Sequence, residues 1–183
     1  YIPKKSSEQS VLVLHGVGGN GRLLSFIAVP LAKAGFNVIC PDLPGYGYTK
    51  TDSCFDYNTW IEVGTFMAKE ELKKGRKLFL FGLSAGGMLA YNVTCNIGQV
   101  EGLIVTNILD NRYRTVRDYS AKNKFHSRIG IKLLNILPGF IKKLKIPVKE
   151  VANTRTIVNQ KELLKIMLKD KTGSGSSVSI KFL

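Results

Sequence analysis

The chain has 183 residues, of which 44% are hydrophobic, and its 27 Lys and Arg residues against 13 Asp and Glu residues give a formal net charge of +14. This length can bury one ordinary core, and no apolar run approaches the roughly 18 uncharged residues needed to cross a bilayer. Three scattered cysteines are too few for a disulfide framework, and no CxxC pair or His/Cys cluster indicates a metal site. We therefore expect a globular protein in a reduced, cytoplasmic setting, with no metal and no cofactor. Because the chain begins at Tyr1 and not at Met, the lack of a signal peptide says nothing about export.

The positive charge is concentrated in the second part of the chain. Residues 1–110 carry 10 Lys and Arg against 9 Asp and Glu, a balance of +1, and residues 111–183 carry 17 against 4, a balance of +13. Such a field attracts phosphate, anionic lipid head groups and acidic substrates, although surface lysine most often serves solubility. We expect no nucleic-acid partner, because no recognition module or aromatic stacking pattern accompanies the charge.

The first part of the chain alternates short apolar runs with helical patterns. Residues 11–14 (VLVL) are β-branched or apolar and run into a glycine-rich loop, which is typical of a buried parallel strand. Residues 22–34 show helical spacing that stops at Gly35, and residues 36–40 predict the next strand, which Pro41 breaks. The pattern continues with a helix over residues 58–72, a strand over 78–81, a helix over 84–94 and a strand over 102–106. This order predicts an α/β fold with a doubly wound, mostly parallel sheet.

The alternation stops after Asp110. Residues 111–170 look helical throughout, without an obvious strand, and we expect them to form an insertion that sits on the sheet. Apolar residues at helical spacing oppose lysines there, and Pro138-Gly139 splits this stripe into two helices. The stripe consists of Leu133, Leu134, Leu137, Phe140, Ile141 and Leu144. The predicted division is a core over residues 1–110, a helical cap over 111–171, and a flexible joint at 172–177 that begins the return to the core over 172–183.

Residues 82–86 (GLSAG) form a GxSxG pentapeptide. It follows a buried strand and opens a helix, which is the context that this motif requires. Glycines two before and two after the serine are needed because a strand turning directly into a helix brings the backbones too close for side chains. The free amides and dipole of a helix N-terminus favour negative charge on Ser84, which is therefore predicted to be a nucleophile. The alternative is an N-cap serine in a glycine-rich turn.

A His-Gly loop, residues 15–19 (HGVGG), follows the first strand. With the pentapeptide, it resembles the α/β-hydrolase family, in which a loop at this place supplies one oxyanion-hole amide and the residue after the nucleophile supplies the other. The resemblance assigns these amides to Val17 and Ala85 and makes His15 a loop-shaping residue rather than the base. A phosphate-binding turn is the alternative, but the glycines fit neither GxGxxG nor a P-loop, because no Lys-Ser/Thr pair follows.

A third motif, residues 41–47 (PDLPGYG), matches a turn that this family carries after the second of these strands. There Asp42 would be a turn former and not a triad acid. The resemblance is to capped esterases and lipases of the monoacylglycerol-lipase-like kind. A serine at the nucleophile position argues against the haloalkane dehalogenase and epoxide hydrolase mechanisms, in which this residue is aspartate.

The catalytic triad of this family is incomplete in the chain. The family order is serine, acid, histidine, and the one histidine after Ser84 is His126, which lies in the lysine-rich insertion where a surface or substrate-contact role is more common. Asp110, which follows the predicted strand over residues 102–106, is the candidate acid of the triad. The alternative is that its side chain stabilises the turn that leads from this strand into the helical insertion. We therefore expect a chain truncated at both ends, with the base and the acid beyond residue 183.

The expected function is hydrolysis of a carboxylic ester, lipid-like or with a small acyl group, through an acyl-enzyme on Ser84. Two alternatives stay open: a thioesterase or peptidase variant, and a noncatalytic member of the fold that binds a ligand or a partner. The expected partners are the ester substrate and, by weak contact of the basic cap, an anionic membrane surface. The alternative to membrane contact is that the cap helices pack their apolar faces on the sheet and leave their lysines in water. This arrangement explains the same opposition of apolar residues and lysines.

Overall fold

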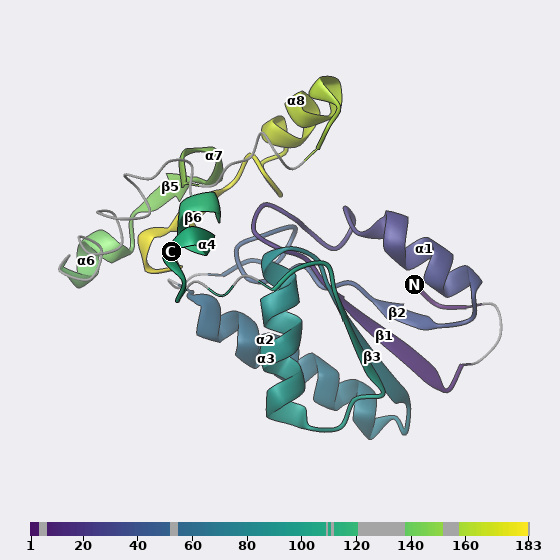
Figure 1. Cartoon of the computed structure of the whole chain (residues 1–183). Helices are drawn as coiled ribbons and strands as arrows, with labels where there is room; N and C mark the ends of the chain where they lie inside the picture. Colours follow the sequence, from purple (N-terminus) through teal and green to yellow (C-terminus); the bar gives the residue numbers. More distant parts are fainter. Residues whose placement is uncertain are drawn as a thin grey trace.

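The computed structural model of the chain describes residues 1–3, 7–51, 55–108, 110, 112–120, 138–151 and 158–182. Its centre is a four-stranded parallel sheet in the order β2-β1-β3-β4, formed by β1 (Gln9–Leu14), β2 (Asn37–Ile39), β3 (Lys77–Gly82) and β4 (Gly102–Val105). Three helices connect successive strands: α1 (Ser25–Lys33), α2 (Tyr57–Lys73) and α3 (Ala85–Ile97) (Figure 1). The predicted α/β fold with a parallel sheet is confirmed.

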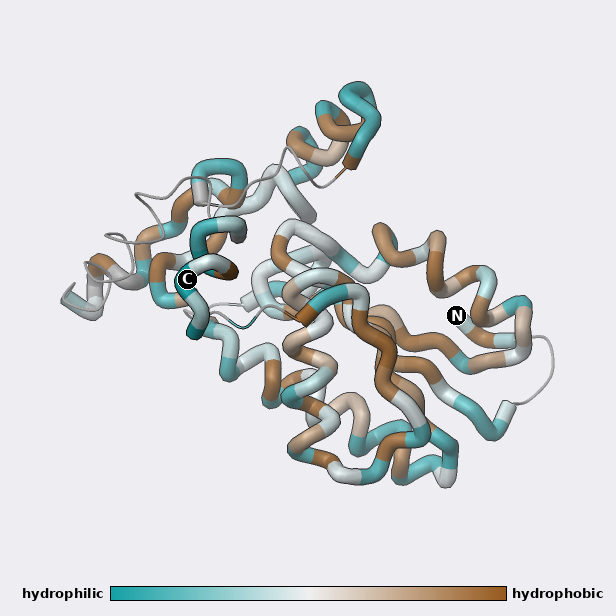
Figure 2. Tube along the Cα trace, viewed as in Figure 1, coloured by the Kyte–Doolittle hydropathy of each residue, from teal (hydrophilic) through white to brown (hydrophobic). Residues whose placement is uncertain are grey.

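The strands are apolar on both faces, and helices cover both. Leu12 and Leu14 of β1 pack in one cluster with residues of α2 and α3, whereas the alternating Val11 and Val13 pack in a second cluster with residues of α1. Figure 2 shows the strands of the sheet as a continuous hydrophobic centre. A sheet that lies between two helical layers needs apolar side chains on both faces. The doubly wound arrangement is therefore confirmed.

Local signals set the ends of the helices. α2 begins after Asp56, whose Oδ1 accepts a hydrogen bond of 3.1 Å from the Thr59 amide while Thr59 Oγ1 accepts from the Asp56 amide, which makes a capping box. α3 ends at Ile97, and Gly98 caps it with a left-handed φ of 68°. α1 begins at Ser25, three residues later than predicted, because Asn20 Oδ1 accepts from the Leu23 amide at 2.9 Å and holds a turn there.

After β4 the chain forms short helices and a small second sheet. The helices are α4 (Arg114–Ser120), α6 (Gly139–Lys142), α7 (Val148–Val151), α8 (Lys161–Lys169) and a short 3-10 helix (Ile180–Phe182). β5 (Lys145–Pro147) pairs antiparallel with β6 (Ser177–Ser179), and Ile146 lies opposite Val178. The expectation of a region without strands was wrong, because strands this short show no alternation. In Figure 1 these elements group at one end of the parallel sheet, and α8 projects from the group.

The segment predicted to be a flexible joint, residues 172–177, is packed instead. Gly173, Ser174 and Ser176 are buried, and the Thr172 carbonyl accepts a hydrogen bond of 2.8 Å from the Gly47 amide. A run of Gly and Ser has no apolar side chain that would predict burial. The contacts that hold it are backbone and hydroxyl hydrogen bonds, which leave no hydrophobic pattern in the sequence.

Much of the predicted cap lies outside the described residues. His126 and the first part of the apolar stripe, Leu133, Leu134 and Leu137, are among them. α6 begins at Gly139, at the predicted break in the stripe. Within the described parts of the chain, no helix combines the length and the apolar character needed to span a membrane.

Candidate active site

Ser84 stands at the turn between β3 and α3. β3 ends at Gly82 and α3 begins at Ala85, so the chain passes from strand to helix almost directly. Ser84 has φ 57° and ψ −127°, and no other non-glycine residue in the described part of the chain has a positive φ. Such a conformation costs about 1–3 kcal/mol and persists only where the surroundings impose it. The Ser84 side chain is exposed, so it is accessible to a substrate.

The glycines around Ser84 are required by close backbone contacts. A Cβ on Gly82 would lie 2.2 Å from the Gly86 carbonyl oxygen, and a Cβ on Gly86 would lie 2.2 Å from the Leu14 carbonyl oxygen. Real Cβ atoms essentially never come this close, and the obstructing atoms belong to the backbone. The predicted reason for these glycines, close approach of the strand and helix backbones, is confirmed.

Hydrogen bonds from two neighbouring strands hold the backbone of the turn. The Ser84 amide donates to Thr106 Oγ1 at 3.0 Å, and the Leu83 amide donates to the Leu14 carbonyl at 3.0 Å. Thr106 Oγ1 in turn donates to Asn107 Oδ1 at 3.0 Å. Thr106 was not among the site residues predicted from the sequence. Its one signal is its place directly after β4, beside the turn that holds Ser84.

The two amides assigned to the oxyanion hole lie at this turn. A Cβ on Gly16 would come within 2.9 Å of the Leu83 carbonyl and 3.1 Å of the Ala85 nitrogen, so the loop before Val17 lies directly against the turn. Ala85 is the first residue of α3, and its amide has no acceptor within the helix. Among the described residues, neither the Val17 nor the Ala85 amide donates a hydrogen bond. Both amides can therefore bind an oxygen of a ligand.

His15 is buried beneath the loop, and both of its ring nitrogens are used. Nε2 accepts a hydrogen bond of 3.0 Å from the Leu43 amide, so the proton sits on Nδ1, which donates to the Gly16 carbonyl at 2.8 Å. Burial lowers the pKa of His15, although the Gly16 carbonyl and the Asp42 charge oppose this change. The ring is therefore neutral, and neither nitrogen can receive the Ser84 proton. His15 shapes the loop, as the resemblance implied.

Aromatic side chains surround His15 and stabilise the turn beside it. The His15 ring meets Tyr46 and Trp60 edge-to-face, with centroids 5.5 and 5.7 Å apart. Trp60 Nε1 donates to the Pro44 carbonyl at 3.0 Å. Burial raises the pKa of Tyr46 to about 12, so its hydroxyl stays protonated.

Asp42 organises the loop that follows β2. Its Oδ1 accepts from the Gly21 amide at 2.8 Å and its Oδ2 accepts from the Tyr48 amide at 2.8 Å. Gly47 has φ 59°, and a Cβ there would lie 1.9 Å from Asp42 Cγ. Both carboxylate oxygens are committed to backbone amides, so the prediction that Asp42 is a turn former is confirmed.

Asp110 pairs with an arginine two residues away. Arg112 donates to it through Nε at 2.9 Å and through Nη2 at 2.7 Å, and the Arg112 amide donates to Asp110 Oδ1 at 3.0 Å. Hydrogen bonds from Arg112 lower the pKa of Asp110. Among the described residues, no hydrogen bond joins Asp110 to Ser84 or His15. These contacts match the alternative role of Asp110, which is to cap the turn after β4. The other candidate for the triad, His126, lies outside the described residues.

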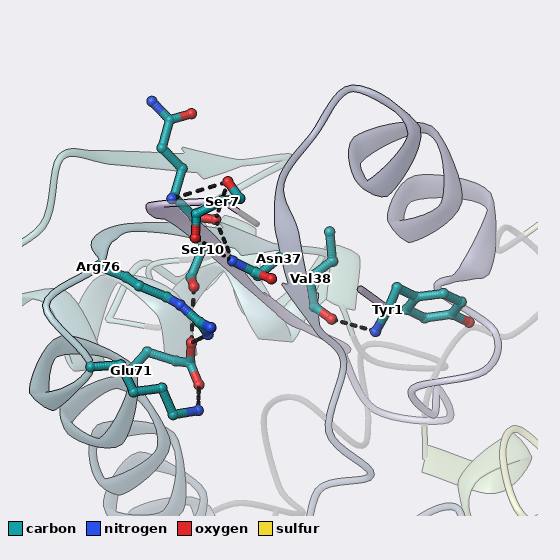
Figure 3. Close-up of polar contacts among 9 residues, drawn as sticks. Tyr1, Ser7, Ser10, Asn37, Val38, Glu71 and Arg76 are labelled. Carbon is teal, nitrogen blue, oxygen red and sulfur yellow. Dashed lines mark hydrogen bonds and ion pairs between the residues drawn. The ribbon is translucent and has the colours of Figure 1, made fainter. Parts of the chain in front are cut away.

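A second polar cluster lies at the amino ends of β1 and β3 (Figure 3), whereas Ser84 follows the carboxyl end of β3. Glu71 of α2 is 5% exposed, accepts hydrogen bonds from Ser10 Oγ at 2.9 Å and Arg76 Nη1 at 3.1 Å, and pairs with Lys74. Burial raises the pKa of Glu71, but the hydrogen bonds from Lys74, Ser10 and Arg76 together outweigh it and lower the pKa. A cavity of about 470 Å³ opens beside the cluster. Because parallel sheets bind ligands at the carboxyl ends of their strands, we assign this cluster a structural role.

Comparison with known proteins identifies the same fold. The family model of the alpha/beta hydrolase fold matches residues 9–162. No protein with a curated description matches the chain in sequence.

Three solved structures illustrate the likeness. A monoacylglycerol lipase from Paleococcus ferrophilus has a TM-score of 0.76 at 19% identity, covering 99% of this chain and 64% of its own. A thermostable carboxyl esterase from Bacillus coagulans has a TM-score of 0.71 at 21% identity, covering 99% and 63%. A monoglyceride lipase from Saccharomyces cerevisiae has a TM-score of 0.71 at 17% identity, covering 97% and 58%. The chain thus spans less than two thirds of the length of these proteins.

Proposed function

The chain belongs to the α/β-hydrolase fold family, and on that premise we propose that it carries the nucleophile and oxyanion hole of a serine hydrolase that cleaves a carboxylic ester. The observation that carries this proposal is the strained turn at Ser84, where an exposed serine has a positive φ at the start of α3. An N-cap serine would accept a hydrogen bond from the helix, but the Ser84 side chain makes none. Strain at an exposed hydroxyl that caps nothing favours a reactive role.

The reaction begins with attack of Ser84 Oγ on the carbonyl carbon of the ester. The serine proton passes to a base, and negative charge develops on the carbonyl oxygen. The Val17 and Ala85 amides stabilise this charge, helped by the positive end of the α3 dipole. The alcohol leaves with a proton, and water then hydrolyses the acyl-enzyme.

A general base must join these groups, and the described residues do not supply it. His15 is excluded because Leu43 and Gly16 occupy its two nitrogens. Asp110 remains the candidate acid, but its carboxylate would have to leave Arg112 before it could orient a histidine. We place the base, and by preference the acid, outside the described residues.

The substrate class proposed is a carboxylic ester with a small or lipid-like acyl group. The structural neighbours named as monoacylglycerol lipase and carboxyl esterase favour this class over a thioester or an amide. Rates on p-nitrophenyl esters with short and long acyl chains, compared with a thioester and an anilide, would rank these substrates. A clear preference for the thioester or the anilide would contradict the ester assignment.

Ester hydrolysis by matched serine variants tests the mechanism. We expect Ser84→Ala to lower kcat about a thousandfold or more, as removal of a triad member does. Ser25→Ala is the control, because Ser25 begins α1 and its side chain caps nothing; its kcat should equal that of the parent. Hydrolysis that survives in Ser84→Ala would remove Ser84 from the mechanism, and a folded full-length protein, with its base included, that shows no hydrolysis would favour the noncatalytic binding protein.

We further propose that residues 111–171 form a cap that makes weak contact with an anionic membrane surface. α8 carries lysines at positions 161, 165 and 169, and its apolar Leu163 and Ile166 are 42% and 67% exposed. The balance of +13 over residues 111–183 complements anionic lipid head groups. Each lysine near such a surface contributes about 1 kcal/mol, which salt screens.

Sedimentation with lipid vesicles tests this contact. Vesicles of phosphatidylglycerol should bind the protein, more weakly as salt rises, and vesicles of phosphatidylcholine should not. Ile166→Glu should weaken binding, whereas Phe66→Glu, at an apolar residue of α2 that is 64% exposed, should not. Equal binding by both variants, or none by the parent, would contradict the membrane contact.

A further inference from the structure

Residues 172–176 pack against the loop that contains Val17, one of the two residues proposed to supply the oxyanion-hole amides. We call residues 172–176 the bracing segment and residues 16–20 the oxyanion loop. Ser174 Oγ donates a hydrogen bond of 2.9 Å to the Gly18 carbonyl, and this bond is buried although 156 positions separate the two residues. Gly18 follows Val17 directly. The bond therefore holds the backbone beside the Val17 amide.

The two segments approach each other at glycines. Gly18 has φ 79°, and a Cβ there would lie 3.1 Å from Ser174 Oγ and 3.3 Å from Ser174 Cα. A Cβ on Gly173 would lie 3.0 Å from the Gly18 carbonyl oxygen. The Ser174 side chain is the one group that bridges the two backbones at Gly18, and it is hydrogen-bonded to the loop. A displacement of the bracing segment would therefore displace the oxyanion loop as well.

Thr172 makes a second attachment at the other end of the loop. Its Oγ1 accepts from Asn20 Nδ2 at 3.3 Å and donates to Asp170 Oδ1 at 2.7 Å. Its carbonyl accepts from the Gly47 amide at 2.8 Å. The hydrogen bond from Thr172 lowers the pKa of Asp170, because it stabilises the charged carboxylate that accepts it. Two hydroxyl contacts thus hold the oxyanion loop at two points, Gly18 and Asn20.

From these contacts we infer that the bracing segment positions the oxyanion hole, an inference that rests on the function proposed above. Ser174 and Thr172 are positioning residues, because they contact the loop and not the reacting atoms. An oxyanion hole lowers the barrier only when its donors are fixed before the charge develops. The bracing segment follows α8 in the chain, so it also connects the proposed cap to the oxyanion loop.

Amide hydrogen exchange on the intact protein tests this positioning without depending on catalysis. In Ser174→Ala the amides of residues 17–20 should exchange about fivefold faster, because losing one hydrogen bond of ordinary strength raises local opening by that factor. Ser177→Ala is the matched control, since the Ser177 hydroxyl makes no hydrogen bond to another described residue. Equal exchange in the two variants would overturn the inference, whatever the activity of the protein.

Ester kinetics separate positioning from a general loss of stability. A misplaced oxyanion donor weakens transition-state binding alone, so Ser174→Ala and Thr172→Val should lower kcat about fivefold with KM unchanged. Thr172→Ser keeps the hydroxyl and should restore kcat. Faster loop exchange with unchanged kcat would contradict the positioning role. If the parent shows no hydrolysis that depends on Ser84, the proposed function fails, and the exchange comparison still decides whether the segment braces the loop.

Discussion

The strained backbone of Ser84 depends on residues that lie far from it in the sequence. Thr106, 22 positions later, accepts the hydrogen bond from the Ser84 amide, and Leu14, at the end of β1, accepts the one from Leu83. The pentapeptide itself was predictable because its glycines must lie two residues on either side of the serine. Thr106 was not predictable, because any polar residue after β4 satisfies the pattern and only the folded sheet places its hydroxyl beside Ser84.

Thr106→Val removes the hydroxyl and keeps the size of the side chain. The Ser84 amide then loses its acceptor at a strained position, so the free energy of unfolding should fall by about 1 kcal/mol, and labelling of Ser84 by a fluorophosphonate should slow. Urea denaturation and labelling rates measure the two effects. Thr106→Ser keeps the hydroxyl and should behave like the parent. Parent-like stability and labelling in Thr106→Val would show that the hydroxyl does not support the turn.

Glu71 connects α2 to the sheet at the amino ends of the strands (Figure 3). Its carboxylate binds Ser10 of β1 and Arg76, which lies directly before β3. Its neighbour Glu70 pairs with Lys73, and the side chains of this pair are 41% and 72% exposed, against 7% for the Glu71 side chain. The same turn of α2 thus carries a buried carboxylate, Glu71, beside a partly exposed one, Glu70. This pair of residues allows a buried ion cluster to be compared with a surface ion pair.

Glu71→Gln should lower the free energy of unfolding at pH 7 by roughly 1–2 kcal/mol, and Glu70→Gln by less than about 0.5 kcal/mol. The folded protein lowers the pKa of Glu71 below its ordinary value of 4.5. The stabilisation is therefore complete above that ordinary value and is lost as the pH falls through the lowered pKa. Urea denaturation from pH 7 to pH 3 should show the gap between parent and Glu71→Gln closing in acid. A gap that does not change with pH would contradict the role of the charge.

The longer elements could be predicted from the sequence, and the short ones could not. β1 and β3 are continuous apolar runs bounded by glycine or charge, and α2 has both periodicity and a capping box. β5 and β6 are three residues each, and their pairing joins positions at least 30 residues apart. The packing of residues 172–176 depends on hydroxyl and backbone contacts. Neither kind of contact leaves a periodic signal in the sequence.

The whole molecule places its chemical groups at the carboxyl ends of the parallel strands. The oxyanion loop follows β1, the Asp42 turn follows β2 and Ser84 follows β3. A parallel sheet brings these loops to one edge, so their meeting was predictable once the strands were recognised. The base was not predictable in the same way, because the chain holds two histidines. Of these, His15 is committed to the core and His126 lies outside the described residues.

The most direct test of a nucleophilic Ser84 is covalent labelling of the intact protein with a fluorophosphonate, followed by peptide mass mapping. One probe molecule per chain should be found on the peptide that contains Ser84, and Ser84→Ala should take up none, because no other described serine has a positive φ at a strand-to-helix turn. A folded parent that takes up no probe, or a probe found on another residue, would contradict the assignment of Ser84 as the nucleophile.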